Sequence, residues 1–180
     1  MHRLFVALRP PPAVRAALSA AMEGLPGARW QDDEQLHLTL RFIGEVDRHR
    51  AEDIAAALAG ISAPPVAARV EGVGTFDTRG YVDTLWARVV PVDALAALHR
   101  KVDQAVARAG IAPDRRRYLP HVTLARFGRR AADSAAIARW VEAHAGLATA
   151  PFPLDHLLLY ESHLTGDGAR YDAVARWRLD

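Results

Sequence analysis

The chain has 180 residues, of which 51% are hydrophobic and 24% charged, a balance typical of a soluble domain with a sizeable core. Its formal net charge is only +2 and it has no cysteine, so bulk charge does not indicate a nucleic-acid-binding protein, and disulfides and thiolate metal sites are excluded. No apolar run approaches the ~20 residues that cross a bilayer, and the opening segment lacks a cleavage site for a signal peptide. We therefore expect one cytoplasmic domain over residues 1–180 with no membrane partner.

Apolar residues recur at strand or helix spacing in segments separated by proline, glycine and polar residues. Strands are expected over 4–8, 36–43, 66–73, 85–90, 154–160 and 171–177. Helices are expected from the prolines at 10–12 to before Pro26, and over 47–59, 93–109 and 133–144. Asp47 and Asp93 are the expected N-caps and Gly110 the expected C-cap, with turns over 72–80 and 165–168. Because many strands are joined by turns rather than helices, this pattern favours an α+β fold with antiparallel sheets.

One short motif occurs twice, as LHLTLRF over residues 36–42 and as PHVTLARF over residues 120–127. Since side chains alternate along a strand, His37 and Thr39 share one face, and His121 and Thr123 share another. The two motifs lie about half a chain length apart, which indicates an internal duplication. We therefore expect a bilobal fold of two pseudo-twofold-related lobes, each with antiparallel sheet and packed helices, and each giving one histidine strand to a shared cleft.

Two imidazoles on opposite sides of a phosphorus atom form an acid–base pair, in which one activates water and the other protonates the departing oxygen. The hydroxyls of Thr39 and Thr123 can donate to the non-bridging phosphate oxygens. Such a site needs neither metal nor cofactor when the leaving group is good, and a strained five-membered cyclic phosphate meets that condition. We expect a bell-shaped pH profile with both limbs within roughly two units of neutrality.

Arginine is suited to phosphate because its planar group makes forked contacts with anionic oxygens. Arg41 continues the alternation of His37, so we expect it on the cleft face if the strand is regular. Arg126 is out of step with His121 and reaches the cleft only through a bulge or a turn. Phe42 is a candidate stacking surface for a base, although an aromatic residue at such a position is more often part of the core.

Together these residues resemble the 2H phosphoesterases, named for two His-x-Thr/Ser-x motifs, and within them the RNA 2′,3′-cyclic phosphodiesterases, also called 2′-5′ RNA ligases. The likeness covers nearly the whole chain, in RLFVAL, HLTLRFIGEV, EGVGTF, PHVTLARF and LLLYESHLTGDGARYDAVARW. The resemblance implies that His37 and His121 are catalytic and that Thr39 and Thr123 bind phosphate. It also implies that Arg126 contacts the phosphate or the nucleotide.

The reaction implied by the resemblance is metal-independent hydrolysis of an RNA 2′,3′-cyclic phosphate end to a 2′-phosphomonoester. In that scheme His37 is the acid that protonates the 3′ oxygen and His121 is the base. The same site, with a 5′-hydroxyl as the nucleophile, would reversibly join the cyclic end as a 2′-5′ linkage without ATP.

Three alternatives remain open. The first is a phosphodiesterase that acts on small cyclic nucleotides or on ADP-ribose cyclic phosphate. The second is a non-catalytic module that binds RNA ends. The third is a histidine-based metal site, which needs a carboxylate or a third histidine from elsewhere in the fold. A cleft between two lobes is complete within one chain, so a monomer is the expected state.

Overall fold

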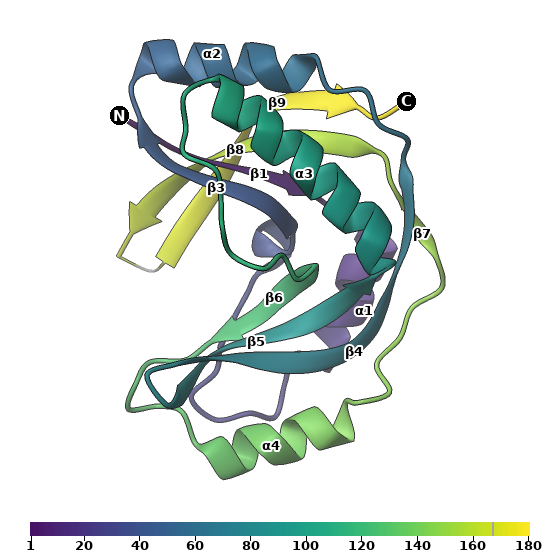
Figure 1. Cartoon of the computed structure of the whole chain (residues 1–180). Coiled ribbons are helices and arrows are strands. Elements are labelled where there is room, and N and C mark those ends of the chain that lie inside the picture. Colours follow the sequence, from purple (N-terminus) through teal and green to yellow (C-terminus); the bar gives the residue numbers. More distant parts are fainter. Residues whose placement is uncertain (167) are drawn as a thin grey trace.

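Nine strands and four α-helices make up the computed structural model, which describes residues 1–166 and 168–180 (Figure 1). The strands are β1 (His2–Leu8), β2 (Arg29–Trp30), β3 (Leu38–Val46), β4 (Val66–Thr78), β5 (Tyr81–Val90), β6 (His121–Arg126), β7 (Phe152–Leu154), β8 (His156–Thr165) and β9 (Gly168–Arg178). The helices are α1 (Pro12–Ala21), α2 (Arg48–Ala59), α3 (Val92–Arg108) and α4 (Ser134–Ala143), with a short 3-10 helix, η1 (Asp33–Gln35). The strand pairs are antiparallel, which confirms the predicted α+β class.

The strand order is β7-β4-β5-β6-β3-β1-β8-β9, with β2 paired to β6. In the middle of this strand order β3 is paired with β6, at the register pair Leu38 and Val122. The β6 group (β4, β5, β6) and the β3 group (β3, β1, β8, β9) diverge from that junction, as Figure 1 shows. Each motif strand thus lies at the inner edge of its group, β6 beside β5 and β3 beside β1. Two lobes related by a pseudo-twofold axis remain our interpretation of this order.

Helices cover the outer sides of the two groups (Figure 1). α2 and α3 contact each other and lie on the β3 group, where α3 contacts β3 and α2 contacts β1. α4 lies against the β6 group, and its Trp140 ring is 5.8 Å from that of Trp30 on β2. Apolar residues at helical spacing on α2 and α3 are buried in one core cluster, including Ile54, Leu58, Leu95, Leu98, Val102 and Val106.

The helix ends follow the predicted chemistry in two of three places. The Asp47 carboxylate accepts from the Arg50 amide at 2.8 Å, which confirms it as the N-cap of α2. Gly110 has φ 87° after α3, and its amide and that of Ile111 donate to carbonyls of the last helical turn. The predicted cap Asp93 is wrong, because α3 begins one residue earlier, at Val92, and Asp93 lies in the first turn.

The turn predicted over residues 72–80 is wrong in extent. β4 continues to Thr78, and the chain reverses only at Arg79 and Gly80. Glycines misled the prediction because Gly74 lies within the strand, where a Cβ atom would be 2.4 Å from the Trp86 ring. The closing turn expected over 165–168 includes residue 167, which lies outside the described residues.

Candidate active site

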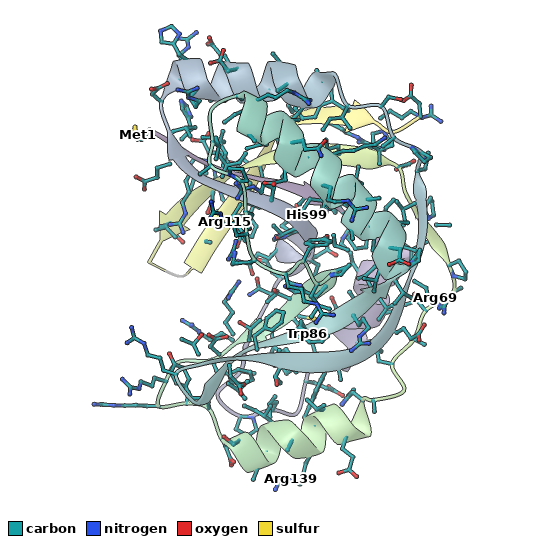
Figure 2. All side chains as sticks on the ribbon, in the orientation of Figure 1. Met1, Arg69, Trp86, His99, Arg115 and Arg139 are labelled. Atoms are coloured by element: carbon teal, nitrogen blue, oxygen red, sulfur yellow. The ribbon has the colours of Figure 1, made fainter. Side chains whose placement is uncertain are left out.

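The two motif histidines lie side by side where the β3 and β6 groups meet. His37 directly precedes β3 and His121 is the first residue of β6. Because the two strands are antiparallel, the register pair of Leu38 with Val122 sets His37 across from Thr123 and His121 across from Thr39. The two histidines therefore lie diagonally across the junction, close enough for the charge of His121 to lower the pKa of His37. Figure 2 shows Trp86, a neighbour of His121, on the side of β5 that faces the β3 group. The predicted convergence of the two motifs is present in the structure.

Both imidazoles are held in the same way by a backbone carbonyl two residues earlier in the chain. His37 Nδ1 donates to the Gln35 carbonyl oxygen at 2.7 Å, and His121 Nδ1 donates to that of Leu119 at 2.7 Å. A carbonyl only accepts, so Nδ1 carries the hydrogen in the neutral ring and Nε2 is the atom that gains or loses a proton. At His37, the Thr39 hydroxyl lies 3.1 Å from that Nε2 atom.

Burial makes both histidines harder to charge than a histidine in water. It lowers the pKa of His37 from 6.5 to about 4, with further lowering from His121, Arg126 and Arg9, against an opposing hydrogen bond to the Gln35 carbonyl. Burial also lowers the pKa of His121, with a further contribution from Arg126. The site without substrate thus holds two neutral imidazoles near pH 7, and a bound anion would favour the charged forms.

Aromatic rings surround each histidine, and they account for much of this burial. The ring centroids of Phe5, Tyr171 and Tyr160 lie 4.9, 5.2 and 6.0 Å from that of His37. Those of Phe76 and Trp86 lie 4.9 and 6.1 Å from that of His121. The sequence interpretation missed these five residues because they come from other strands, and no local pattern connects them to the motifs.

Each motif strand contains a bulge at the leucine that follows its threonine. The register of β3 against β1 skips Leu40, and that of β6 against β5 skips Leu124. An extra residue reverses the alternation that follows it. Phe42 and Arg126 therefore turn toward the histidines, and Arg41 turns away.

The prediction that Arg41 shares the face of His37 is wrong for this reason. The side chain is only 7% exposed, and its Nε donates to an Asp103 carboxylate oxygen on α3 at 2.7 Å. It also donates to the carbonyls of Phe42 and Ala112, and lies 3.8 Å from the Asp114 carboxylate. Arg41 thus ties β3 to α3 and to the loop that precedes β6.

Two aromatic side chains fix the backbone at the β3 bulge. His99 Nδ1 donates to the Leu40 carbonyl at 2.7 Å, and the Tyr118 hydroxyl donates to the Thr39 carbonyl at 3.2 Å. Their rings stack with centroids 4.2 Å apart. Figure 2 shows His99 pointing from α3 toward the region between the two strand groups. Two hydrogen bonds from stacked rings therefore hold the bulge, and with it the position of Phe42.

Phe42 is 51% exposed and separates two cavities. The first, of about 480 Å³, includes His121, Thr39, Phe42, Phe76, Tyr118, Asp77, Asp114, Arg116 and Arg117. The second, of about 430 Å³, is lined by Arg3, Leu4, Phe5, Phe42, Gly44, Arg126, Ser162, Leu164, Ala169 and Tyr171. From the sequence, Arg126 could reach the cleft only through a bulge or a turn, and β6 contains such a bulge at Leu124. The second motif hydroxyl, Thr123, is partly exposed and lies two residues after His121 on β6.

Among residues 1–166 and 168–180, no group of three or more histidine, aspartate or glutamate side chains is placed to hold a metal ion. Over the same residues, the helices are too short or too polar for a membrane span.

The fold and the site define an antiparallel α+β protein with paired, carbonyl-anchored histidines from a repeated motif. The family model of the 2′-5′ RNA ligase superfamily matches residues 4–166, and the chain belongs to that superfamily.

Curated relatives carry the name RNA 2′,3′-cyclic phosphodiesterase. The one from Methanocaldococcus jannaschii is 25% identical, covering 97% of this chain and 99% of the relative. The one from Aeropyrum pernix is 29% identical, covering 87% and 88%. Among solved structures, a protein from Thermus thermophilus is 26% identical with a TM-score of 0.79, covering 98% of this chain and 97% of its own. An E. coli LigT complex with 3′-AMP is 24% identical with a TM-score of 0.77, covering 99% and 98%.

Proposed function

We propose that this protein is an RNA 2′,3′-cyclic phosphodiesterase that hydrolyses the cyclic end to a 2′-phosphomonoester by two-histidine acid–base catalysis. The observation that supports this proposal most is the pair of neighbouring imidazoles, each with Nδ1 anchored and Nε2 left for proton transfer. Arg126 adds a positive charge close enough to lower the pKa of both histidines. The names of the relatives support the same substrate class.

In the proposed reaction, His121 Nε2 takes a proton from water while the water oxygen bonds to phosphorus. The bond from phosphorus to the 3′ oxygen breaks, and His37 Nε2 gives its proton to that oxygen, which leaves the phosphate on the 2′ oxygen. Thr39, Thr123 and Arg126 hold the non-bridging oxygens. With a 5′-hydroxyl in place of water as the nucleophile, the same bond to the 3′ oxygen breaks and a 2′-5′ linkage forms. The choice of His37 as the acid follows the family resemblance.

The low pKa of His37 is compatible with an acid role once substrate is present. A cyclic phosphate carries a negative charge, and an opposite charge within a few ångströms favours the protonated imidazole. The Thr39 hydroxyl, which donates to His37 Nε2 in the site without substrate, can turn to a phosphate oxygen instead. Substrate binding and protonation of His37 therefore support each other.

The test uses an oligoribonucleotide with a 2′,3′-cyclic phosphate end, incubated with enzyme in EDTA, and phosphorus NMR to identify the product. We expect a 2′-phosphate from the wild type, and at least a ~100-fold lower kcat for His37→Ala and for His121→Ala, since each removes one proton-transfer group. The exposed His49→Ala is the matched control and should keep full activity.

Each other outcome points to a different function. Equal turnover by either motif variant contradicts the catalytic assignment, provided that its melting temperature is unchanged. Turnover that requires one added divalent metal would favour a metal site. Binding of the RNA end without turnover would favour a non-catalytic module, and faster turnover of cyclic mononucleotides or ADP-ribose cyclic phosphate would favour a small-molecule substrate.

A further inference from the structure

The cavity on the His37 side of Phe42 has no part in the reaction described above, apart from Arg126 at its edge. We call it the Arg3 pocket, lined by Arg3, Phe42, Arg126, Ser162 and Tyr171 among others. Its volume is about 430 Å³. The charged side chains among its described lining residues are two arginines, without a carboxylate. Such a lining suits an anion that lies against aromatic and hydroxyl groups.

Strand register explains why these residues meet. Antiparallel pairing of Leu4 with Glu161 places the neighbouring Arg3 beside Ser162, and Ser162 itself pairs with Tyr171. Arg3, Ser162 and Tyr171 thus form a row across β1, β8 and β9. Alternation along β1 puts Arg3 on the same face as Phe5, whose ring packs on His37. The row is therefore a continuation of the catalytic face.

Arg3 is available to a ligand. Its side chain is exposed and makes neither a hydrogen bond nor an ion pair with any residue in the described part of the chain. Of the nearby carboxylates, Glu161 is 3.0 Å from His2, and Glu45 lies opposite Arg3 in the β1–β3 register without an ion pair.

Tyr171 links this arginine to the site. Burial raises the pKa of the Tyr171 phenol, and the charges of Arg126 and Arg3 oppose that rise, so both guanidinium groups act on this side chain. The Tyr171 ring also meets that of His37 edge-on, with centroids 5.2 Å apart. An anion between Arg3 and Arg126 would therefore lie about one aromatic ring away from the reacting phosphate.

The two cavities differ in the charge of their linings, and this difference indicates which part of the substrate each one would bind. In the cavity beside His121, the carboxylates of Asp77 and Asp114 balance the charges of Arg116 and Arg117, and the rings of Phe42, Phe76 and Tyr118 suit a nucleobase. The lining of the Arg3 pocket has two arginines and no carboxylate among the described residues, so its net charge favours an anion. In an RNA end, one ribose connects the 2′,3′-cyclic phosphate to the phosphodiester at its own 5′ oxygen, so a second anion accompanies the reacting one.

We propose that the Arg3 pocket binds the phosphodiester on the 5′ side of the reacting nucleotide, so that the enzyme recognises the end of a polynucleotide rather than a free cyclic mononucleotide. This inference rests on the proposed function, because it takes the reacting phosphate to lie between the two histidines. Arg3 is the residue that it adds, as a specificity determinant with no part in proton transfer.

The test is a binding measurement, which does not depend on turnover. The Kd values of 2′-AMP and adenosine 2′,5′-bisphosphate are measured by calorimetry for the wild type, Arg3→Gln and Arg170→Gln. Arg170 is the matched control because it pairs with Asp172 on the opposite face of β9. We expect the added 5′-phosphate to tighten wild-type binding about tenfold, as one charge-assisted contact does. Arg3→Gln should remove most of that gain, and Arg170→Gln should retain it.

Equal Kd values for the two ligands in the wild type would overturn the inference, as would a gain that persists in Arg3→Gln. A protein that binds neither ligand contradicts the proposed function as well, so the two failures are distinguishable. A kinetic comparison completes the test. The ratio of kcat/KM on a dinucleotide with a cyclic end to that on 2′,3′-cyclic AMP should fall about tenfold in Arg3→Gln. An unchanged ratio would contradict the inference.

Discussion

Replacing Arg41 with methionine should destabilise the protein far more than replacing an exposed arginine. The side chain is 7% exposed, and its carboxylate partners Asp103 and Asp114 are 17% and 14% exposed. Removing one member of such a pair leaves uncompensated charge and costs about 3–5 kcal/mol. We expect about 3 kcal/mol, the lower end, because Asp114 keeps its contact with Arg116 at 2.7 Å.

Urea unfolding followed by tryptophan fluorescence measures this loss. With a slope of about 2 kcal/mol per molar, a 3 kcal/mol loss lowers the midpoint by roughly 1.5 M. Arg48→Met is the matched control, since Arg48 pairs with Glu52 on the surface, where such a pair contributes about 0.5 kcal/mol or less. The double variant Arg41→Met/Asp103→Leu should recover much of the loss, because both charges of the Arg41–Asp103 pair are then absent and Asp114 keeps Arg116 as its partner. An unfolding midpoint for Arg41→Met equal to that of Arg48→Met would refute the stabilising role of the buried Arg41–Asp103 pair.

Two further predictions concern the site. Burial lowers the pKa of both histidines in the free enzyme, so the pair carries one proton, the form that acts, only below pH 6.5. We therefore expect kcat/KM to peak on the acid side of pH 6.5 and to fall as pH rises. It should fall again near pH 4, where a second proton binds and leaves no neutral imidazole to act as the base. A maximum of kcat/KM above pH 7 in a steady-state profile would contradict the lowered pKa values of the two histidines. Gly74→Ala should lower stability by about 1–3 kcal/mol and slow turnover, because its Cβ displaces the Trp86 ring that flanks His121. Thermal unfolding checks it against Gly146→Ala, whose Cβ meets nothing within 4 Å, and equal melting temperatures would contradict it.

Features that depend on near neighbours could be predicted from the sequence. The N-cap at Asp47, the buried spacing of Ile54 and Leu58, and the helix end at Gly110 all follow from residues a few positions apart. The short elements β2, β7 and η1 were missed because two or three residues show no period. The low pKa of His37 was also missed, so the acid limb of the pH profile now lies beyond the two units of neutrality first expected.

Only the residues of the repeated motif could be predicted as part of the candidate site. The repeated motif indicated His37 and His121, yet a bulge has no sequence signature, so the exchange of Arg41 for Phe42 on the cleft face required the structure. Aromatic rings from strands distant in the sequence, such as that of Tyr171, could not be predicted from local sequence patterns. The same limit explains Arg3, which meets the site only through the β1–β8–β9 register.

The strands that enclose His37 have a consequence for the newly synthesised chain. His37 emerges early, but two of the rings packed on it, Tyr160 and Tyr171, belong to β8 and β9 and are translated more than a hundred residues later. A fragment that stops after the second motif contains both histidines and the ring of Phe5, but it lacks two of the three aromatic rings around His37. Such a fragment should be catalytically silent, and the enzyme becomes competent only when its last hairpin has folded back onto its first strand.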